Sequence, residues 1–142
     1  MSTLARAIAV AAQAHIDQQD KSGAPYILHP LRMMLRMDTE PEMMVAVLHD
    51  VVEDTDWSID KLRSDGFPEV VLTAVESLTH RAGESYDAFV ARAAANPIGR
   101  KVKLADLEDN MDVKRIDDLS DRDVERIRKY HRAWRLLSNT PR

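Results

Sequence analysis

A short run of side chains that can bind a cation or move a proton stands out in the middle of the sequence. Residues 49–55 read His-Asp-Val-Val-Glu-Asp-Thr and follow an apolar stretch. In a helix, side chains three or four residues apart share a face, which groups His49, Asp50, Glu53 and Asp54. Imidazole and carboxylate groups this close suit a divalent transition metal, and a cation would relieve the repulsion between the carboxylates. A solvated acidic helix end is the alternative interpretation.

Two other segments carry polar side chains at useful spacing. His29 stands directly before Pro30, at the end of a loop that begins near Asp20, and it could equally be a helix N-cap. Lys103, Asp106 and Asn110 are three and four residues apart, so they line one face of a helix. A solvated face with a Lys103–Asp106 ion pair explains that spacing as well.

The elements that must position these residues are predicted to be helices. Apolar residues recur at helical spacing, proline stands at plausible helix starts, and sustained alternation typical of strands is missing. The predicted helices cover residues 3–19, 30–37, 41–54, 58–64, 68–79, 85–95, 97–111 and a last one from 120. The sequence therefore predicts an all-α fold, a compact bundle of seven or eight helices in a single domain over residues 1–142.

Composition narrows the classes of protein. The 142 residues carry a formal net charge of −4 and no cysteine, which excludes disulfide frameworks, thiolate metal sites and a cysteine nucleophile. The mild acidity weighs against nucleic-acid binding. Apolar runs stay far shorter than the roughly 20 residues of a membrane span, and no basic-then-apolar leader opens the chain. We therefore expect a cytoplasmic protein with no membrane partner, as a monomer or small homo-oligomer.

Taken together and in order, the three segments resemble one known pattern. The matching residues are Ala14-His15, Lys21-Ser22-Gly23, Pro25-Tyr26-Ile27, His29-Pro30, the whole of 49–55, residues 102–106 and Asn110-Met111. The chain resembles the HD-domain phosphohydrolases, and specifically the hydrolase domain of RelA/SpoT-type alarmone enzymes, over about residues 4–115. The resemblance implies removal of the 3′-pyrophosphate from (p)ppGpp. The short length looks like that of a stand-alone small alarmone hydrolase.

The resemblance also implies roles by position. Four residues match metal ligands, usually for manganese: His29, His49, Asp50 and Asp106. Two match the acidic pair that orients or deprotonates the attacking water: Glu53 and Asp54. Three match residues that contact the nucleotide or its phosphates: Lys21, Ser22 and Asn110. Lys103 and Arg81 are further candidates for phosphate binding, although Arg81 also fits an exposed loop arginine. His15 lies on an apolar stripe and is interpreted as a core histidine.

Departures from the family pattern leave the substrate open. Asp20 stands where the family commonly has arginine, and residues 107–109 are more acidic than usual, which makes an adenine alarmone, (p)ppApp, a serious candidate beside (p)ppGpp. Three alternatives remain beside the alarmone hydrolase. They are another HD-type phosphatase acting on a nucleotide or NADPH, a nucleotide-binding sensor without turnover, and a helical interaction module with a structural metal.

Overall fold

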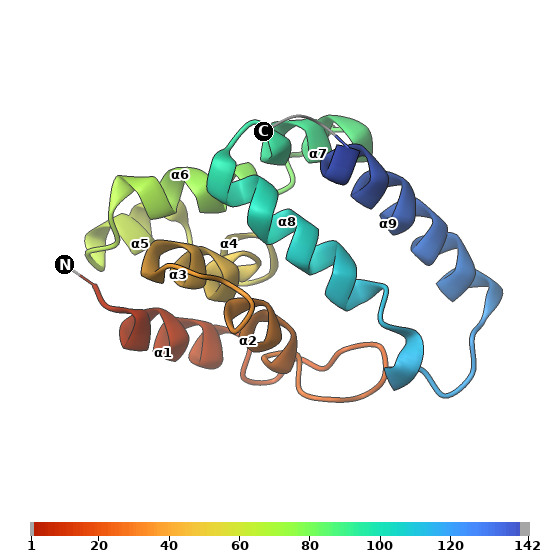
Figure 1. The fold of residues 1–142 in the computed structure, drawn as a ribbon. Helices are drawn as coiled ribbons and strands as arrows, with labels where there is room; N and C mark the ends of the chain where they lie inside the picture. The colour runs from red at the N-terminus through yellow and green to blue at the C-terminus, as the bar shows by residue number, and fades with distance from the viewer. Residues whose placement is uncertain (1, 140–142) are drawn as a thin grey trace.

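A computed structural model describes residues 2–139. Over this range there are nine α-helices and one 3-10 turn, and no strand (Figure 1). The helices are α1 (Leu4–Ala14), α2 (Leu28–Met34), α3 (Glu40–Leu48), α4 (Val51–Asp54), α5 (Ile59–Ser64), α6 (Glu69–Ser77), α7 (Tyr86–Ala94), α8 (Pro97–Asn110) and α9 (Asp121–Asn139), with η1 (Val113–Arg115) before α9. The all-α prediction is confirmed. The single-domain prediction stays a prediction, and residues 1 and 140–142 lie outside the described range.

Side-chain caps explain where several helices begin. Thr39 and Glu42 form a reciprocal capping box at the start of α3. Ser85 accepts a hydrogen bond from the Ala88 N–H at the start of α7. Asn96 caps α8, whose first residue, Pro97, needs no hydrogen-bond partner for its nitrogen. These caps satisfy backbone N–H groups that a helix end otherwise leaves unpaired.

The helix count differs from the prediction because one predicted helix is broken. The segment 41–54 forms two helices, α3 and α4, which are separated at His49 and Asp50. Asp50 has φ −105° and ψ 0°, outside the helical range, and serves as the N-cap of α4. The first helix is also shorter than predicted: it ends at Ala14 instead of continuing to residue 19. The break places the His-Asp pair at the junction of two helices rather than on one continuous face.

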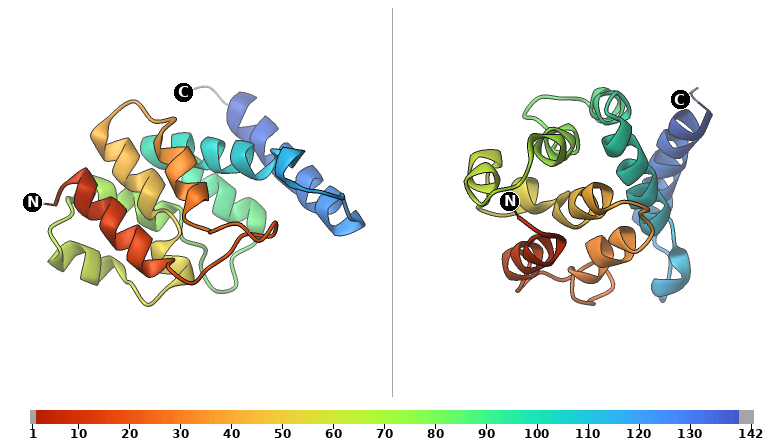
Figure 2. Two further views of the ribbon diagram at one scale, coloured as in Figure 1. Left: turned by 90° about the horizontal axis from the view of Figure 1, so that it is seen from below. Right: turned by 60° about the vertical axis from the view of Figure 1, so that its left-hand side comes forward.

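Helix α3 occupies the centre of the main core. It packs against α1, α2, α6 and α8, which surround it in the two views of Figure 2. Its residues 45–48 have no exposed surface, so this helix is apolar on every side near its C-terminal end. Removing such side chains from water is the main stabilising contribution to a fold of this kind. The His-Asp pair therefore follows directly after four fully buried residues.

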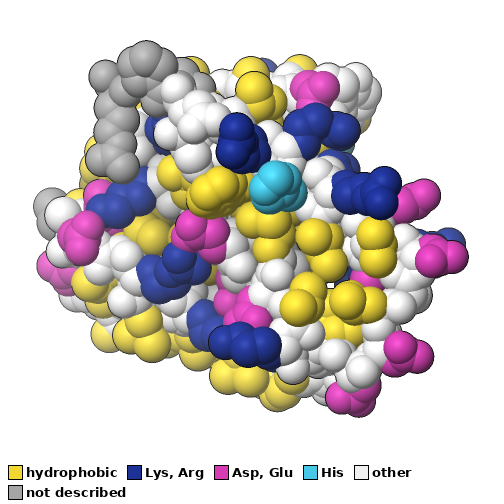
Figure 3. Space-filling model, turned by 45° about the vertical axis from the view of Figure 1, so that its right-hand side comes forward, with side chains coloured by type: hydrophobic (Ala, Val, Ile, Leu, Met, Phe, Trp, Pro, Cys, Tyr) yellow, Lys and Arg dark blue, Asp and Glu magenta, His cyan; other side chains and the backbone are white. Residues whose placement is uncertain are grey.

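A smaller apolar cluster joins α9 to α7 and α8. Its buried members are Val90, Leu107, Ala133 and Leu137. The surface around α9 mixes basic, acidic and apolar side chains (Figure 3). No helix among residues 2–139 is both long and apolar enough to cross a membrane.

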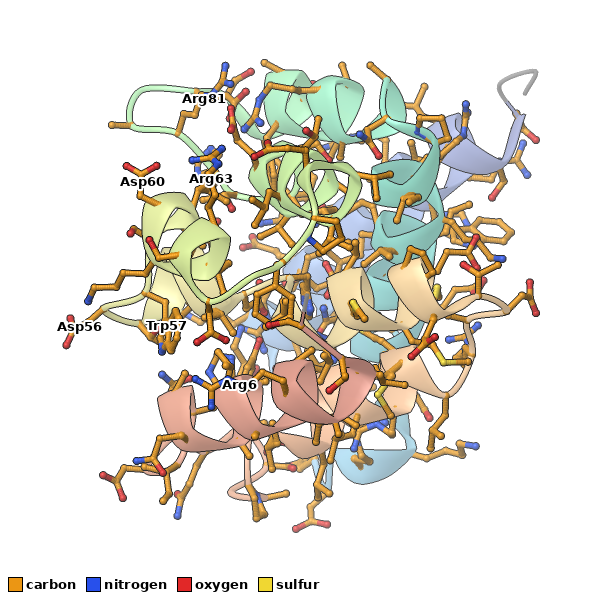
Figure 4. All side chains as sticks on the ribbon, turned by 90° about the vertical axis from the view of Figure 1, so that its left-hand side faces the viewer. Arg6, Asp56, Trp57, Asp60, Arg63 and Arg81 are labelled. Carbon is orange, nitrogen blue, oxygen red and sulfur yellow. The ribbon has the colours of Figure 1, made fainter. Side chains whose placement is uncertain are left out.

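The opposite side of the molecule carries exposed ion pairs, one of them within α5 and the others between neighbouring segments. Arg6 of α1 donates from Nε and Nη2 to the two carboxylate oxygens of Asp65, at 2.7 and 2.9 Å, just beyond α5. Arg63 of α5 pairs with Asp60 and Glu69. Figure 4 shows Arg6 and Arg63 on this side, away from α9. Exposed pairs of this kind contribute little to stability, because water and salt screen them.

Candidate metal centre and its pocket

Two histidines and two aspartates from separate segments meet at the end of α3. Nε2 of His49 lies 3.0 Å from Oδ2 of Asp50 and 3.7 Å from Oδ1 of Asp106. Nε2 of His29, from α2, lies 3.0 Å from that same Asp106 oxygen, which α8 contributes. One ligand atom from each of His29, His49 and Asp50 fits within a mutual distance of 4.8 Å. The structure thus brings the four predicted metal ligands together.

The donor atoms of this cluster fit a divalent metal. Nδ1 of His49 lies 2.7 Å from the carbonyl oxygen of Ala46, which can only accept, so Nδ1 carries the proton. Nε2 of His49 is fully buried and makes no well-aligned hydrogen bond within residues 2–139, although an oxygen of Asp50 lies 3.0 Å away. A buried imidazole nitrogen without a well-aligned hydrogen bond, facing carboxylates, is a suitable ligand for manganese, iron, cobalt or zinc.

The electrostatics of the cluster also favour positive charge. Burial alone lowers the pKa of an imidazole, yet the carboxylates of Asp50 and Asp106 raise the pKa of His49 well above its ordinary value. Burial likewise opposes the charged form of His29, but hydrogen bonds with Asp106 and Asp109 raise its pKa as well. The carboxylates therefore attract a cation strongly enough to outweigh desolvation of the histidines.

The predicted acidic pair lies on the solvent side of the cluster. Glu53 and Asp54 are exposed, and with Asp50 they place three carboxylates within 4.8 Å of one another. Oε1 of Glu53 accepts a hydrogen bond of 2.7 Å from the backbone N–H of His80, which holds the side chain in place. Partial burial, together with the charges of Asp50 and Glu53, raises the pKa of Asp54 to about 6. Asp54 is thus a carboxylate that can exchange a proton near neutral pH.

A pocket of about 580 Å³ adjoins this cluster. One side is the loop 19–26 and the other is formed by residues between Asn110 and Tyr130. Lys21, Ser22 and Asn110, all predicted to contact substrate, line it. Two lining residues reach the cluster: the Tyr26 hydroxyl donates to Asp50, and Nδ2 of Asn110 donates to Oδ1 of Asp106 at 2.9 Å. The pocket therefore borders the candidate metal centre at Tyr26 and Asn110, and the four candidate ligands lie behind these two residues rather than in the pocket lining.

Positive charge in the pocket is mostly paired internally. Arg115 lies 3.3 Å from Asp112, and Arg126 pairs with Asp123. In the described part of the chain, no carboxylate oxygen lies within ion-pair distance, 4.0 Å, of the ammonium nitrogen of Lys21. Lys21 is therefore the cation in this pocket most available to an incoming anion.

Two predicted phosphate-binding residues lie outside the pocket lining. Lys103 is only 7% exposed, and its ammonium group lies 3.0 Å from Asp106 and 4.8 Å from the ring centre of Phe89. The structure thus gives Lys103 the ion pair that the helical spacing also allowed. Arg81 is an exposed loop residue whose guanidinium lies 3.5 Å from Glu76, on the side drawn in Figure 4. The structure does not bring either residue to the pocket surface.

Two residues near the centre are not among the site residues that the sequence predicts. In the sequence Tyr26 is only part of a motif, but its hydroxyl contacts Asp50 and its ring lies 4.9 Å from that of His15. Asp109 belongs to an acidic run of the sequence, but it is 7% exposed and contacts His29. The signal that could have identified Asp109 is its spacing of three from Asp106, which puts both carboxylates on the same side of α8.

His15 is the buried core histidine that the sequence predicted. It is 1% exposed, and its Nδ1 lies 2.8 Å from Oε1 of Gln18. Its Nε2 has no partner among residues 2–139. Burial lowers the pKa of His15, so this ring is neutral at pH 7.

Comparison with known proteins places the chain in a family. No family model matches it. It is 37% identical to a GTP pyrophosphokinase of Streptomyces coelicolor over 75% of this chain and 14% of that protein. It is 34% identical to a guanosine-3′,5′-bis(diphosphate) 3′-pyrophosphohydrolase of Aquifex aeolicus over 75% of this chain and 17% of that protein. The chain thus spans less than a fifth of the length of these relatives.

A solved structure shares the fold. It is described as a metazoan ortholog of SpoT that hydrolyzes ppGpp, and it superimposes with a TM-score of 0.79 at 21% identity, covering 98% of this chain and 86% of that one. The shared helical fold agrees with the sequence similarity and with the ordered motifs that end at Asn110-Met111. The chain belongs to the RelA/SpoT-type HD-domain family.

Proposed function

We propose that this chain is a metal-dependent hydrolase that removes the 3′-pyrophosphate from nucleotide alarmones such as (p)ppGpp or (p)ppApp. The observation that carries the proposal is the contact of the imidazole–carboxylate cluster with two residues of the pocket lining, Tyr26 and Asn110. A nucleotide in the pocket can thereby present a phosphoryl group to the cluster. The names of the relatives, among them the 3′-pyrophosphohydrolase of Aquifex aeolicus, support the choice of substrate.

The cation that we propose is Mn²⁺, held by His29, His49, Asp50 and Asp106. Two imidazole nitrogens and two carboxylates leave coordination positions open for water and substrate. When bound, a divalent ion would lower the pKa of its water and offset negative charge that develops on the phosphoryl oxygens.

The exposed acidic pair is suited to handle the proton of the attacking water. The oxygen of water forms a bond to the phosphorus attached to the ribose 3′ oxygen, and that ester bond breaks to release pyrophosphate. Glu53 is oriented by the His80 N–H, and Asp54 has a pKa of about 6, so a carboxylate here can accept the water proton at pH 7. The proton then neutralises the ribose 3′ oxygen, which leaves as a hydroxyl group.

The pocket residues supply binding and leave the base preference to experiment. We assign Lys21 to substrate phosphate, because the other pocket cations already have carboxylate partners, and Ser22 and Asn110 to polar contacts. Asp20 holds the loop: its Oδ1 accepts from Ser22 N–H at 2.9 Å, Ser22 Oγ at 2.7 Å and Ala24 N–H at 3.0 Å. Asp20, which departs from the family pattern, thus stabilises this loop through hydrogen bonds. The base preference stays open, and (p)ppApp remains a candidate substrate beside (p)ppGpp.

The test is pyrophosphate release by the purified protein with MnCl₂, with ppGpp and ppApp assayed side by side and EDTA as control. We expect release from at least one nucleotide, abolished by EDTA. Glu53→Gln is expected to lower turnover by about 100-fold or more while Mn²⁺ binding and melting temperature are kept. Unchanged turnover in this variant would remove Glu53 from the reaction.

The other outcomes point to the rival functions. Release from neither nucleotide, with Mn²⁺ bound, would reject the alarmone substrate and favour another phosphate ester, such as a nucleotide or NADPH. Nucleotide binding without turnover would favour a sensor. Unfolding on chelation, without any activity, would favour an interaction module with a structural metal.

A further inference from the structure

Asp109 is a buried carboxylate that holds the far side of a candidate metal ligand. Its Oδ2 lies 2.5 Å from Nδ1 of His29, and both side chains are less than 10% exposed. On the other side of the same ring, Nε2 of His29 lies 3.0 Å from Oδ1 of Asp106. The imidazole of His29 is therefore fixed at both nitrogens by carboxylates of one helix, α8.

The chemistry of this contact determines which nitrogen of His29 can bind a cation. An ionised carboxylate only accepts hydrogen bonds, so the nitrogen facing Asp109 must carry a proton. By the same rule Nε2, which faces Asp106, carries a proton while no cation is present. A cation bound between His29 and Asp106 would replace that proton, whereas the proton on Nδ1 would stay hydrogen-bonded to Asp109. A carboxylate behind a ligating histidine sets the tautomer, fixes the ring orientation and raises the basicity of the ligating nitrogen.

We propose that Asp109 is a positioning residue for the metal centre, which orients His29 and sets its tautomer so that Nε2 is available to a divalent cation. This inference rests on the proposed metal site and not on the identity of the nucleotide. It concerns the residue behind the ligand, whereas the proposed ligands are the four residues that face the cation.

The surroundings of Asp109 are those of a built contact. Burying a carboxylate is costly unless it is paired and hydrogen-bonded. Arg32 supplies two hydrogen bonds, from Nε to Oδ1 at 2.8 Å and from Nη2 to Oδ2 at 3.0 Å. Arg115 lies 3.6 Å from Oδ2 and donates to the backbone carbonyl of Asp109 at 2.8 Å. The two guanidinium groups keep the carboxylate ionised and in place against His29.

Arg115 also connects this contact to the pocket. It lines the pocket beyond α8, and its hydrogen bond to the Asp109 carbonyl fixes η1 against the end of that helix. The neighbouring residue offers a contrast, because Glu108 points away to Arg36 and the indole N–H of Trp134. Glu108 is thus a matched control, with the same charge on the same helix but no contact to a ligand.

The experiment is a titration of the full-length, substrate-free protein with Mn²⁺, in which free Mn²⁺ is measured by electron paramagnetic resonance. Asp109→Asn is expected to bind Mn²⁺ about 10- to 100-fold more weakly than the wild type. Glu108→Gln is expected to stay within about twofold, since it removes the same charge without touching His29. Wild-type affinity in Asp109→Asn, or an equal loss in both variants, would overturn the proposal.

A charge effect must be separated from an orientation effect. Asp109→Asn leaves Arg32 without its carboxylate, and this guanidinium could repel the metal by itself. Adding Arg32→Gln to Asp109→Asn restores the local charge but not the acceptor-only carboxylate behind His29, because an asparagine amide can turn either its oxygen or its NH₂ group toward the ring. We expect the double variant to remain weak; recovery of wild-type affinity would show that Asp109 acts only through charge.

A measurement on the wild type keeps the proposal testable if the variants fail to fold. In nitrogen-15 spectra of the histidine rings with Zn²⁺ bound, His29 should carry its proton on Nδ1 and show the metal-induced shift on Nε2. The opposite assignment would overturn the inference. Neither readout involves a nucleotide, so a protein that shows these results but releases no pyrophosphate would refute the proposed substrate alone. Wild-type protein that binds no divalent cation would refute the metal site and this inference together.

Discussion

Replacing Asp106 by asparagine should destabilise the protein through Lys103 rather than through the histidines. Lys103 is only 7% exposed. In the described part of the chain, its ammonium group has one carboxylate within ion-pair distance, that of Asp106 at 3.0 Å. Removing one partner of a buried ion pair costs about 3–5 kcal/mol, because the other charge stays buried. The asparagine oxygen and the nearby ring of Phe89 retain some favourable interaction, so we expect the lower end, about 3 kcal/mol. At about 2–4 °C per kcal/mol for a chain of this size, the melting temperature should fall by about 6–12 °C.

The assay is thermal unfolding followed by circular dichroism in EDTA, for Asp106→Asn and for the double variant Asp106→Asn/Lys103→Met. Methionine fills a similar volume without charge, so the double variant should recover most of the lost melting temperature. It should not recover Mn²⁺ binding, because the carboxylate is still missing. Stability and metal affinity would then respond to different parts of the same pair.

Two results would refute this reasoning. If the double variant melts no higher than Asp106→Asn, the unpaired ammonium is not the cause of the instability. If Lys103→Met alone keeps its stability and Mn²⁺ affinity but raises KM for the nucleotide, Lys103 contacts the substrate, and its interpretation as a candidate for phosphate binding is correct. We expect instead that Lys103→Met is destabilised in EDTA and less so in Mn²⁺, since a bound cation would offset the charge of Asp106.

Two further predictions concern stability away from the site. Hydrogen bonds from Arg92 lower the pKa of Glu84 from its ordinary 4.5 to about 2, so this pair contributes stability above pH 4.5 and loses it as the pH falls toward 2. The difference in melting temperature between the wild type and Glu84→Gln should therefore be full at pH 6 and shrink between pH 4.5 and 3. A difference that stays constant with pH would contradict the pairing. Gly99→Ala should lower the free energy of unfolding by about 1–3 kcal/mol, because a Cβ atom there would overlap Oγ of Ser77 where α6 and α8 cross. Chemical denaturation measures this loss, and an unchanged midpoint would show that the helices can separate without cost.

The sequence predicts the helices well because their signals are local. Apolar spacing and caps such as Ser58 and Ser85 depend on neighbours in the chain, and each predicted segment from 3 to the last helix is helical over most of its length. The break at His49–Asp50 is different. Apolar residues keep their helical spacing across this break, from Val47 to Val51, so the sequence pattern does not predict it. At the break His49 faces Asp106 of α8, and Asp50 accepts from the Tyr26 hydroxyl, so the contacts made there come from distant parts of the chain that a local pattern does not include.

The same distinction, between local sequence signals and tertiary packing, applies to the candidate site. The motifs identified the residues that meet at the end of α3, since each carries a distinctive side-chain type at a distinctive spacing. Spacing alone could not decide whether Lys103 contacts Asp106 or a phosphate, because both uses lie on one helix face; its burial favours the ion pair. Asp109 was missed for a related reason. An aspartate in an acidic run resembles a solvated residue until the packing of α8 against α2 places it behind His29.

The distribution of positive partners implies that the aspartates of the cluster serve different ends. Lys103 offsets Asp106, and Arg32 offsets Asp109, whereas Asp50 has no lysine or arginine within ion-pair distance among residues 2–139. Its partners are His49 and the Tyr26 hydroxyl. Asp50→Asn leaves behind His49, which can release its proton, rather than a lysine that stays charged, so it should cost less in EDTA than Asp106→Asn, about 1–2 kcal/mol.

The same variant should nevertheless bind Mn²⁺ much more weakly, because it removes the carboxylate whose charge is least compensated. The C-terminal end of α3 adds a partial negative charge beside it, which favours a cation at this point. Thermal unfolding in EDTA and Mn²⁺ titration of Asp50→Asn and Asp106→Asn, measured side by side, test this division. Equal destabilisation by the two variants would show that the charges are shared across the cluster, and the assignment of the cation to the Asp50 side would then be wrong.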